Sequence, residues 1–187
     1  MSMPPKNRAR KGWRMKYQIP EDFIIGFEKV DFGTYVLKTS QTITLSQEES
    51  FEFFKDPCNL FEITPDWLDF RMTECSNTGV YEGAEFEYFI KVFGARILWR
   101  SRIIDFNPPQ RFTDVQLIGP YRKWSHLHTF DKVSKGTLLS DFVTYQLPFY
   151  AIPFHAIIKR QLADIFSYRA ARISEWASGN FKRKTYA

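Results

Sequence analysis

The chain has 187 residues, 44% of them apolar and 18% aromatic, which is enough to form a hydrophobic core and excludes a disordered protein. Its net charge of +5 is concentrated at the ends: residues 1–17 hold six basic residues and no acidic one, residues 181–187 hold three basic residues, and the remaining 18–180 carry −4. A folded nucleic-acid-binding face is therefore not expected, since such a domain carries positive charge on its own surface.

The cysteines and the hydropathy bear on where the protein resides. Cys58 and Cys75 show no CxxC or other metal-binding spacing, so we expect a reducing compartment. No run approaches the roughly 20 apolar residues of a membrane span, and the first residues lack the long apolar stretch of a secretory signal. We therefore expect a cytoplasmic protein.

Three segments are expected along the chain. Residues 1–34 are interpreted as a basic, flexible N-terminal extension with a short apolar patch at Phe23 to Phe27, residues 35–180 as one folded domain, and residues 181–187 as a basic C-terminal tail. We interpret the basic ends as solvated; contact with RNA or anionic lipid is the alternative.

The domain begins with a strand near Tyr35, followed by two short helices. Ser46 and Glu49 form the capping box that starts the first helix, and Pro57 opens the second. Short turns then separate six strands, and such brief links allow only antiparallel neighbours. These strands are expected over residues 70–75, 85–93, 95–106, 111–118, 122–133 and 137–147.

The spacing of apolar residues along the chain changes after Pro148 from that of strands to that of a helix. From Pro153 to Trp176 apolar residues recur at three- and four-residue spacing, and Gly179 is a stop signal, which predicts one helix of about 25 residues. An antiparallel sheet with one polar face must bury the other, and only this helix is large enough to cover it. The order therefore predicts an α+β fold in which a curved sheet wraps around the C-terminal helix and encloses a cavity.

Several stretches carry a resemblance to a known superfamily. They are "TPDWLDFR" (64–71), "FGARILWRSRI" (93–103), "PPQRFTDVQLIGPYRKWSHLHTF" (108–130), "DFVTYQLP" (141–148) and "IFSYR" (165–169). Over residues 35–176 the chain resembles the START-like, or SRPBCC, superfamily with its helix-grip fold. Within it, the chain is similar to a ligand-binding subfamily near the polyketide cyclase/dehydrase and lipid-transport proteins. The resemblance implies a small apolar ligand between sheet and helix; we expect no cofactor.

The candidate site lies in the stretch "DVQLIGPYRKWSHLHTF". Trp124, His126, His128 and Phe130 alternate along one strand and so share a face, which we expect to point inward because two of them are large rings. If the other polar residues also face inward, Arg–Asp and His–Asp pairs orient one polar end of a ligand; if they face outward, they form a solvated surface. The candidate ligand-binding residues are Arg100, Asp114, Gln116, Trp124, His126, His128, Phe130, Asp141 and Tyr145.

The same residues could in principle bind a metal ion or catalyse a reaction. The spacing of His126 and His128 is used by some metal sites, but Asp114 or Asp141 would have to supply a further ligand, so we expect no metal. No nucleophile motif occurs. Acid–base catalysis by His126, His128 or Asp141, as in a cyclase or dehydratase, remains an alternative.

The stretch "LPFYAIPFHAII" (147–158) gathers apolar side chains at the start of the long helix. We interpret it as core packing; the alternative is a cavity mouth that touches a membrane during ligand exchange. The sequence thus predicts a domain that binds, and carries, a small hydrophobic ligand such as a lipid, isoprenoid or polyketide. The rivals are an enzyme acting on such a substrate and a partner-binding module that uses the basic ends.

Overall fold

The computed structural model describes residues 17–72 and 79–185. Within them, one antiparallel sheet has the strand order β1–β2–β8–β7–β6–β5–β4–β3. Its strands are β1 (Ile24–Asp31), β2 (Thr34–Ile43), β3 (Arg71–Met72), β4 (Glu85–Val92), β5 (Ala95–Asn107), β6 (Arg111–Ile118), β7 (Lys123–Val133) and β8 (Gly136–Gln146).

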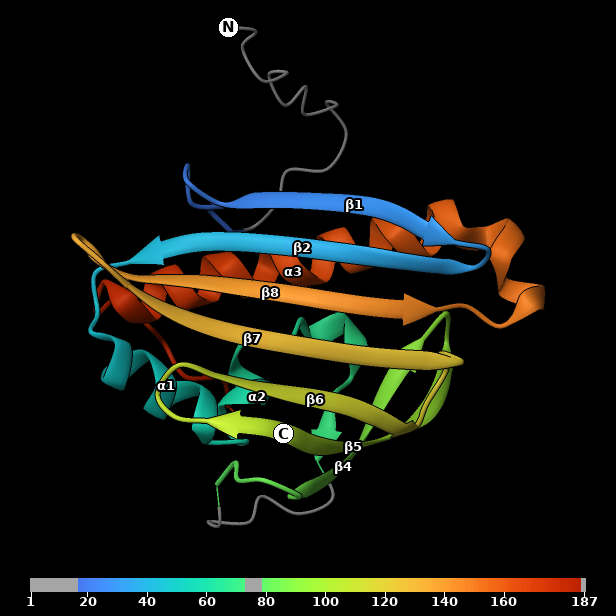
Figure 1. Cartoon of the computed structure of the whole chain (residues 1–187), viewed down its shortest axis with the longest axis horizontal. Coiled ribbons are helices and arrows are strands. Elements are labelled where there is room, and N and C mark those ends of the chain that lie inside the picture. The colour runs from blue at the N-terminus through green and yellow to red at the C-terminus, as the bar shows by residue number, and fades with distance from the viewer. Residues whose placement is uncertain (1–16, 73–78, 186–187) are drawn as a thin grey trace, which may run out of the picture.

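The helices lie on one face and at the ends of this sheet. They are α1 (Gln47–Lys55), α2 (Asn59–Glu62), the 3-10 segments η1 (Asp66–Leu68) and η2 (Phe149–Phe154), and α3 (His155–Ala177). Figure 1 shows α3 running along one face of the sheet, with α1 at the end of the molecule opposite η2. The predicted α+β fold, a sheet wrapped around a long C-terminal helix, is confirmed.

The predicted capping box forms and sets the position of α1. The Ser46 hydroxyl accepts a hydrogen bond from the Glu49 amide at 3.2 Å, and the Glu49 carboxylate accepts one from the Ser46 amide at 3.0 Å. Both bonds satisfy amides that a helix start leaves free. The helix then buries Phe51, whose ring packs edge-on against Phe112 of β6 and Phe130 of β7.

Strand β1 was not predicted and lies in the segment that we assigned to the N-terminal extension. It pairs with β2 from Ile24 to Asp31, and its half-buried Ile25 and Phe27 pack on a core cluster. Only these two positions of β1 face inward, with Gly26 between them, so the alternation is too short to stand out as a strand signal. The flexibility predicted for residues 1–16 concerns a part of the chain outside the described residues.

The C-terminal end also differs from expectation. Helix α3 starts at His155 rather than Pro153, because η2 forms a 3-10 segment before it. Residues that we expected in a solvated tail contact the domain: the Lys184 ammonium lies 2.8 Å from the Asp66 carboxylate, and its amide donates to Glu62 at 2.9 Å. At least this part of the basic tail is held by acidic groups of its own domain.

Two findings bear on the expected compartment. Cys58 is disulfide-bonded, which differs from the reduced state expected from the cysteine spacing, whereas Cys75 lies outside the described residues. Across residues 17–72 and 79–185, no helix has the length and apolar character needed to cross a bilayer. The cytoplasmic location stays a prediction.

Candidate functional site

An internal cavity of about 490 Å³ lies between the sheet and α3. Most of its wall is apolar, with Trp99 and Phe112 from the sheet and Leu162 and Phe166 from α3 among the lining residues. One part of the wall is polar and consists of Asp114, His126, His128 and Arg169. The predicted cavity is confirmed, and its lining is amphipathic.

Strand alternation and register bring the polar side chains together. His126 and His128 are 4% and 7% exposed and project from the inner face of β7. Asp114 on β6 is paired with His126, and Asp141 on β8 is paired with His128. Because residues paired across antiparallel strands project from the same face, one carboxylate from each neighbouring strand flanks the histidine pair.

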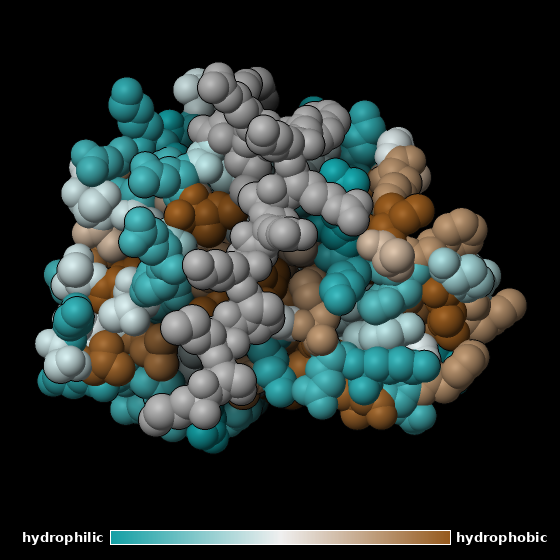
Figure 2. All heavy atoms as spheres, turned by 90° about the horizontal axis from the view of Figure 1, so that it is seen from above, coloured by the Kyte–Doolittle hydropathy of each residue, from teal (hydrophilic) through white to brown (hydrophobic). Residues whose placement is uncertain are grey.

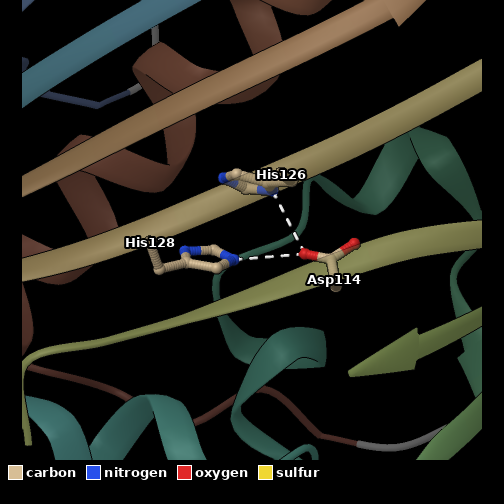
Figure 3. A group of neighbouring side chains, drawn as sticks. All are labelled: Asp114, His126 and His128. Atoms are coloured by element: carbon tan, nitrogen blue, oxygen red, sulfur yellow. Dashed lines mark hydrogen bonds and ion pairs between the residues drawn. The ribbon is translucent and has the colours of Figure 1, made fainter. Parts of the chain in front are cut away.

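The two imidazoles lie between the two carboxylates, with ring centroids 3.8 Å apart. On one side, Asp141 Oδ1 lies 2.9 Å from His126 Nε2, within a hydrogen bond. The same oxygen lies 3.0 Å from His128 Nδ1, but the angles of this second contact are not those of a hydrogen bond. On the other side, Asp114 Oδ2 lies 3.3 Å from His128 Nε2 and 3.5 Å from His126 Nδ1 (Figure 3). Thr39 of β2 donates its hydroxyl to Asp141 at 2.8 Å. We call Asp114, His126, His128 and Asp141 the His–Asp cluster.

Burial and pairing act in opposite directions on the pKa values of the cluster. Burial alone would raise the pKa of Asp141, but the hydrogen bonds and charges of both histidines outweigh it and hold that pKa well below its ordinary value. The pKa of Asp114 is lowered in the same way, with Arg169 contributing. Burial lowers the pKa of His126, whereas for His128 the two carboxylates outweigh burial and raise the pKa. Both carboxylates are therefore ionised, and a proton on the histidine pair favours His128.

Among the polar side chains of the cavity lining that were missed from the sequence, Arg169 and Trp99 stand out. Within residues 17–72 and 79–185, Arg169 Nε and Trp99 Nε1 are buried without a hydrogen-bond partner. The guanidinium of Arg169 lies 5.1 Å from the centre of the Phe166 ring. Arg169 falls three residues after Phe166 and seven after Leu162, so the helical period already placed it on the face that packs on the sheet.

Comparisons with known proteins identify the fold. No family model and no curated protein match the chain. Protein Ms6760 from Mycobacterium smegmatis matches with a TM-score of 0.60 and 14% identity, over 83% of this chain and 99% of that one. The di-domain ARO/CYC StfQ from the steffimycin biosynthetic pathway matches with a TM-score of 0.61 and 14% identity, over 78% of this chain and 52% of that one. Ara h 8.0201 matches with a TM-score of 0.52 and 14% identity, over 79% of this chain and 100% of that one.

The chain has the helix-grip fold. At these identities the likeness shows the fold and not the activity. In this helix-grip domain, Trp124, Asp114, His126 and His128 line the cavity, while Asp141 contacts the histidines and is not among the lining residues. The prediction that the alternating residues of β7 face inward agrees with their burial; their role in binding stays a prediction.

Other candidates lie elsewhere. Arg100 is exposed and bonded to Glu85 at 2.6 Å on the outer face, because its neighbours Trp99 and Ser101 take the inward positions of β5. The Gln116 side chain donates to the Tyr121 carbonyl at 2.7 Å and so closes the turn between β6 and β7. Neither side chain lines the cavity. For both residues, the direction of the side chain could not be predicted from the sequence.

Phe130 and Tyr145 are core residues of the helix-grip domain. Phe130 is 1% exposed and packs against Phe51, Phe54 and Phe112. Tyr145 is fully buried, and its hydroxyl lies 3.1 Å from Nε2 of His155 at the start of α3. Both side chains are buried, which agrees with the inward direction expected for Phe130 and decides the direction left open for Tyr145. They fill the interior beside the cavity instead of lining it.

The cavity reaches the surface between η2 and the turn that joins β4 to β5. Phe93 at that turn and Tyr150 of η2 both line the cavity and are 68% and 66% exposed. Phe149, Phe154 and Ile157 are exposed nearby in sequence, and Figure 2 shows hydrophobic side chains gathered at the end of the molecule where η2 lies, on its right. The stretch interpreted as core packing is thus divided: Leu147, Ile152 and Ile158 belong to or pack on a core cluster, whereas its other large apolar side chains are exposed. We call the exposed side chains of Phe93, Phe149, Tyr150, Phe154 and Ile157 the apolar mouth.

Proposed function

We propose that this chain binds a small molecule with a largely apolar body and one polar end, and that the molecule enters through the apolar mouth. The observation that carries the proposal is the cavity of about 490 Å³, lined mostly by aromatic and aliphatic side chains, with Asp114, His126, His128 and Arg169 at one part of its wall. Small-molecule sites commonly measure about 300–1,000 Å³ and pair an apolar lining with a few placed polar groups.

The ligand class follows from this lining. The aromatic side chains of the lining suit the apolar body of a ligand. The polar part of the wall suits an oxygen-bearing end, as in a lipid, an isoprenoid or a polyketide. The helix-grip fold, shared with the ARO/CYC StfQ, supports membership of the START-like superfamily as part of this proposal. Binding and carrying such a molecule is the simplest function that the cavity supports.

Extraction of the native ligand tests the proposal. Tag-free protein purified from its own host, extracted with organic solvent and analysed by mass spectrometry, should release one stoichiometric apolar compound. In parallel, Leu162→Trp should fill the cavity and weaken binding of a fluorescent apolar probe, whereas Ile104→Trp on the exposed face of β5 should not. No probe binding by the native protein would contradict the proposal.

An acid–base enzyme is the second candidate, favoured by histidines that face the cavity while carboxylates hold them. A cyclase or dehydratase needs a proton donor and acceptor beside a bound carbonyl, and His126 and His128 are placed for this role. Replacing each histidine by Gln and following turnover of a candidate polyketide separates the two functions. Lost turnover with retained ligand binding supports the enzyme.

We further propose that the apolar mouth contacts a membrane while the ligand exchanges. Exposed Lys159 and Arg160 follow the mouth on α3, and their charge complements an anionic lipid surface. A partner-binding module built on the basic ends has less support, because Lys184 is paired with Asp66 of its own domain.

A further inference from the structure

We propose that Asp114, His126 and His128 form a binding site for a divalent first-row transition ion. A ligand in the cavity would complete its coordination, and this last step alone rests on the proposed function. The three side chains converge at the polar wall of the cavity, from two neighbouring strands.

The spacing of the donor atoms fits an ion. One atom from each residue can be chosen so that all lie within 4.8 Å of one another. His128 Nε2 and His126 Nδ1 are 3.3 Å and 3.5 Å from the same Asp114 oxygen, as the converging lines in Figure 3 show. A four-coordinate ion with bonds of about 2.0–2.1 Å holds its ligand atoms about 3.4 Å apart. Both distances from Asp114 therefore match those between ligands of one ion.

The donor set matches known ion chemistry. Two imidazoles and one carboxylate, with positions left open, hold zinc in hydrolytic sites and iron in non-haem sites. From the sequence we expected no metal, because a third ligand had to come from outside the His-x-His spacing. The register of β6 against β7 supplies that ligand by pairing Asp114 with His126.

The surroundings orient the imidazoles as a metal site requires. Asp141 Oδ1 lies 2.9 Å from His126 Nε2 and 3.0 Å from His128 Nδ1, the ring nitrogens that face away from Asp114. Histidines that bind metals almost always donate their second ring N–H to such a group, which fixes the tautomer. Thr39 in turn holds Asp141. Only His126 makes its contact with Asp141 with hydrogen-bond geometry, whereas His128 Nδ1 lies at a similar distance without it. His126 is therefore the imidazole that Asp141 orients so that its other ring nitrogen, Nδ1, can present a lone pair to the ion.

Charge in the cavity supports the same site. The His–Asp cluster contains two half-buried carboxylates, Asp114 and Asp141, and Arg169 is a nearby cation that acts on Asp114. Uncompensated buried charge is costly, and with both imidazoles neutral, as metal ligands are, a divalent ion would offset the remaining negative charge. With Arg169 this leaves an excess positive charge, so the ligand that suits the site carries an anionic oxygen, such as a carboxylate or enolate. The unpartnered Arg169 Nε and Trp99 Nε1 line the same cavity.

Titration with Co²⁺ tests the site in the tag-free full chain after removal of metals by chelator and dialysis. We expect one Co²⁺ per chain with visible absorption bands, one Zn²⁺ by elemental analysis, and a higher melting temperature with Zn²⁺. His126→Gln, His128→Gln and Asp114→Asn should weaken binding by more than the roughly 10–100-fold that loss of an outer partner costs, the effect expected for Asp141→Asn. His155→Gln is the matched histidine control and should bind normally.

Several results would overturn the site. They are the absence of saturable one-to-one binding in the native chain, full binding by folded Asp114→Asn, and an equal loss in His155→Gln. Circular dichroism checks the folding of each variant, and the melting temperature of the native chain with Zn²⁺ gives a readout without substitutions. An apolar probe added to metal-free protein separates the proposals: probe binding without metal binding overturns the metal site alone, whereas no probe binding overturns the proposed function.

Discussion

His128 and Asp141 occupy paired positions on β7 and β8, and His128 Nδ1 lies 3.0 Å from Asp141 Oδ1 inside the domain. The same carboxylate accepts from His126 at 2.9 Å and from the Thr39 hydroxyl at 2.8 Å. One side chain therefore joins three strands, β2, β8 and β7, through their inward-facing groups. Removing it leaves two buried donors, His126 Nε2 and the Thr39 hydroxyl, without this acceptor.

The first prediction is that Asp141→Ala destabilises the metal-free protein by about 1–3 kcal/mol, the usual cost of unsatisfied buried groups. Urea denaturation followed by fluorescence measures the free energy of unfolding. The matched control is Asp131→Ala, which removes an exposed carboxylate from β7 and should cost under about 0.5 kcal/mol. Equal losses in the two variants would show that the cluster contributes nothing special to stability.

The second prediction separates core from cavity. Phe130→Ala should cost about 3–5 kcal/mol, because the ring is 1% exposed and packs against Phe51 and Phe112. Phe93→Ala, with 68% of the side chain exposed at the apolar mouth, should leave the free energy of unfolding nearly unchanged. A small loss for Phe130→Ala would return this residue to the list of ligand contacts.

The inward face of a strand can be predicted from the sequence only where large or apolar residues alternate with polar or small ones. On β7 the alternation of Trp124, His126, His128 and Phe130 with smaller residues indicated the inward face, and their burial agrees with it. On β5, polar side chains occur on both faces, so Arg100 was assigned to the site although Trp99 takes the inward position. Register depends on how two strands align with each other. The pairing of Asp114 with His126 therefore could not be predicted from either strand alone and was seen only in the structure.

The third prediction concerns the N-terminal segment. A chain that starts at Tyr17 should melt as the full chain does, whereas a chain that starts at Gly33 should melt several degrees lower. The second truncation removes β1, exposing the edge of β2 and the core that Ile25 and Phe27 cover. About 2–4 °C is expected for each kcal/mol in a domain of this size. Equal melting temperatures would show that β1 is dispensable, in keeping with our first interpretation of residues 1–34 as a flexible extension.

The fourth prediction tests the apolar mouth. The double change Phe149→Ser and Tyr150→Ser should reduce binding to anionic phospholipid vesicles in a sedimentation assay, because both side chains are largely exposed, at 80% and 66%. Ile104→Ser on the exposed face of β5 is the control. Lys159→Gln with Arg160→Gln should lower binding most at low salt, since screening weakens surface charge interactions. Vesicle binding that none of these changes affects would rule out the membrane role of the mouth.

The last prediction uses His155, which stacks on the Tyr35 ring at 3.6 Å and lies 3.1 Å from the Tyr145 hydroxyl. Burial, with the charges of Lys159 and Lys29, lowers the pKa of this histidine from 6.5. Since the unfolded chain binds the proton more readily, the stability that His155 contributes is present above pH 6.5 and is lost as the pH falls below it.

The native protein should therefore lose more free energy of unfolding between pH 7.5 and pH 5 than His155→Gln, whose amide can still bond Tyr145. Comparing the two chains in urea at both pH values isolates this histidine, because the His–Asp cluster titrates alike in each. The same pH dependence in both chains would mean that the pKa of His155 does not change on folding, and that the Tyr35 stack is open to water.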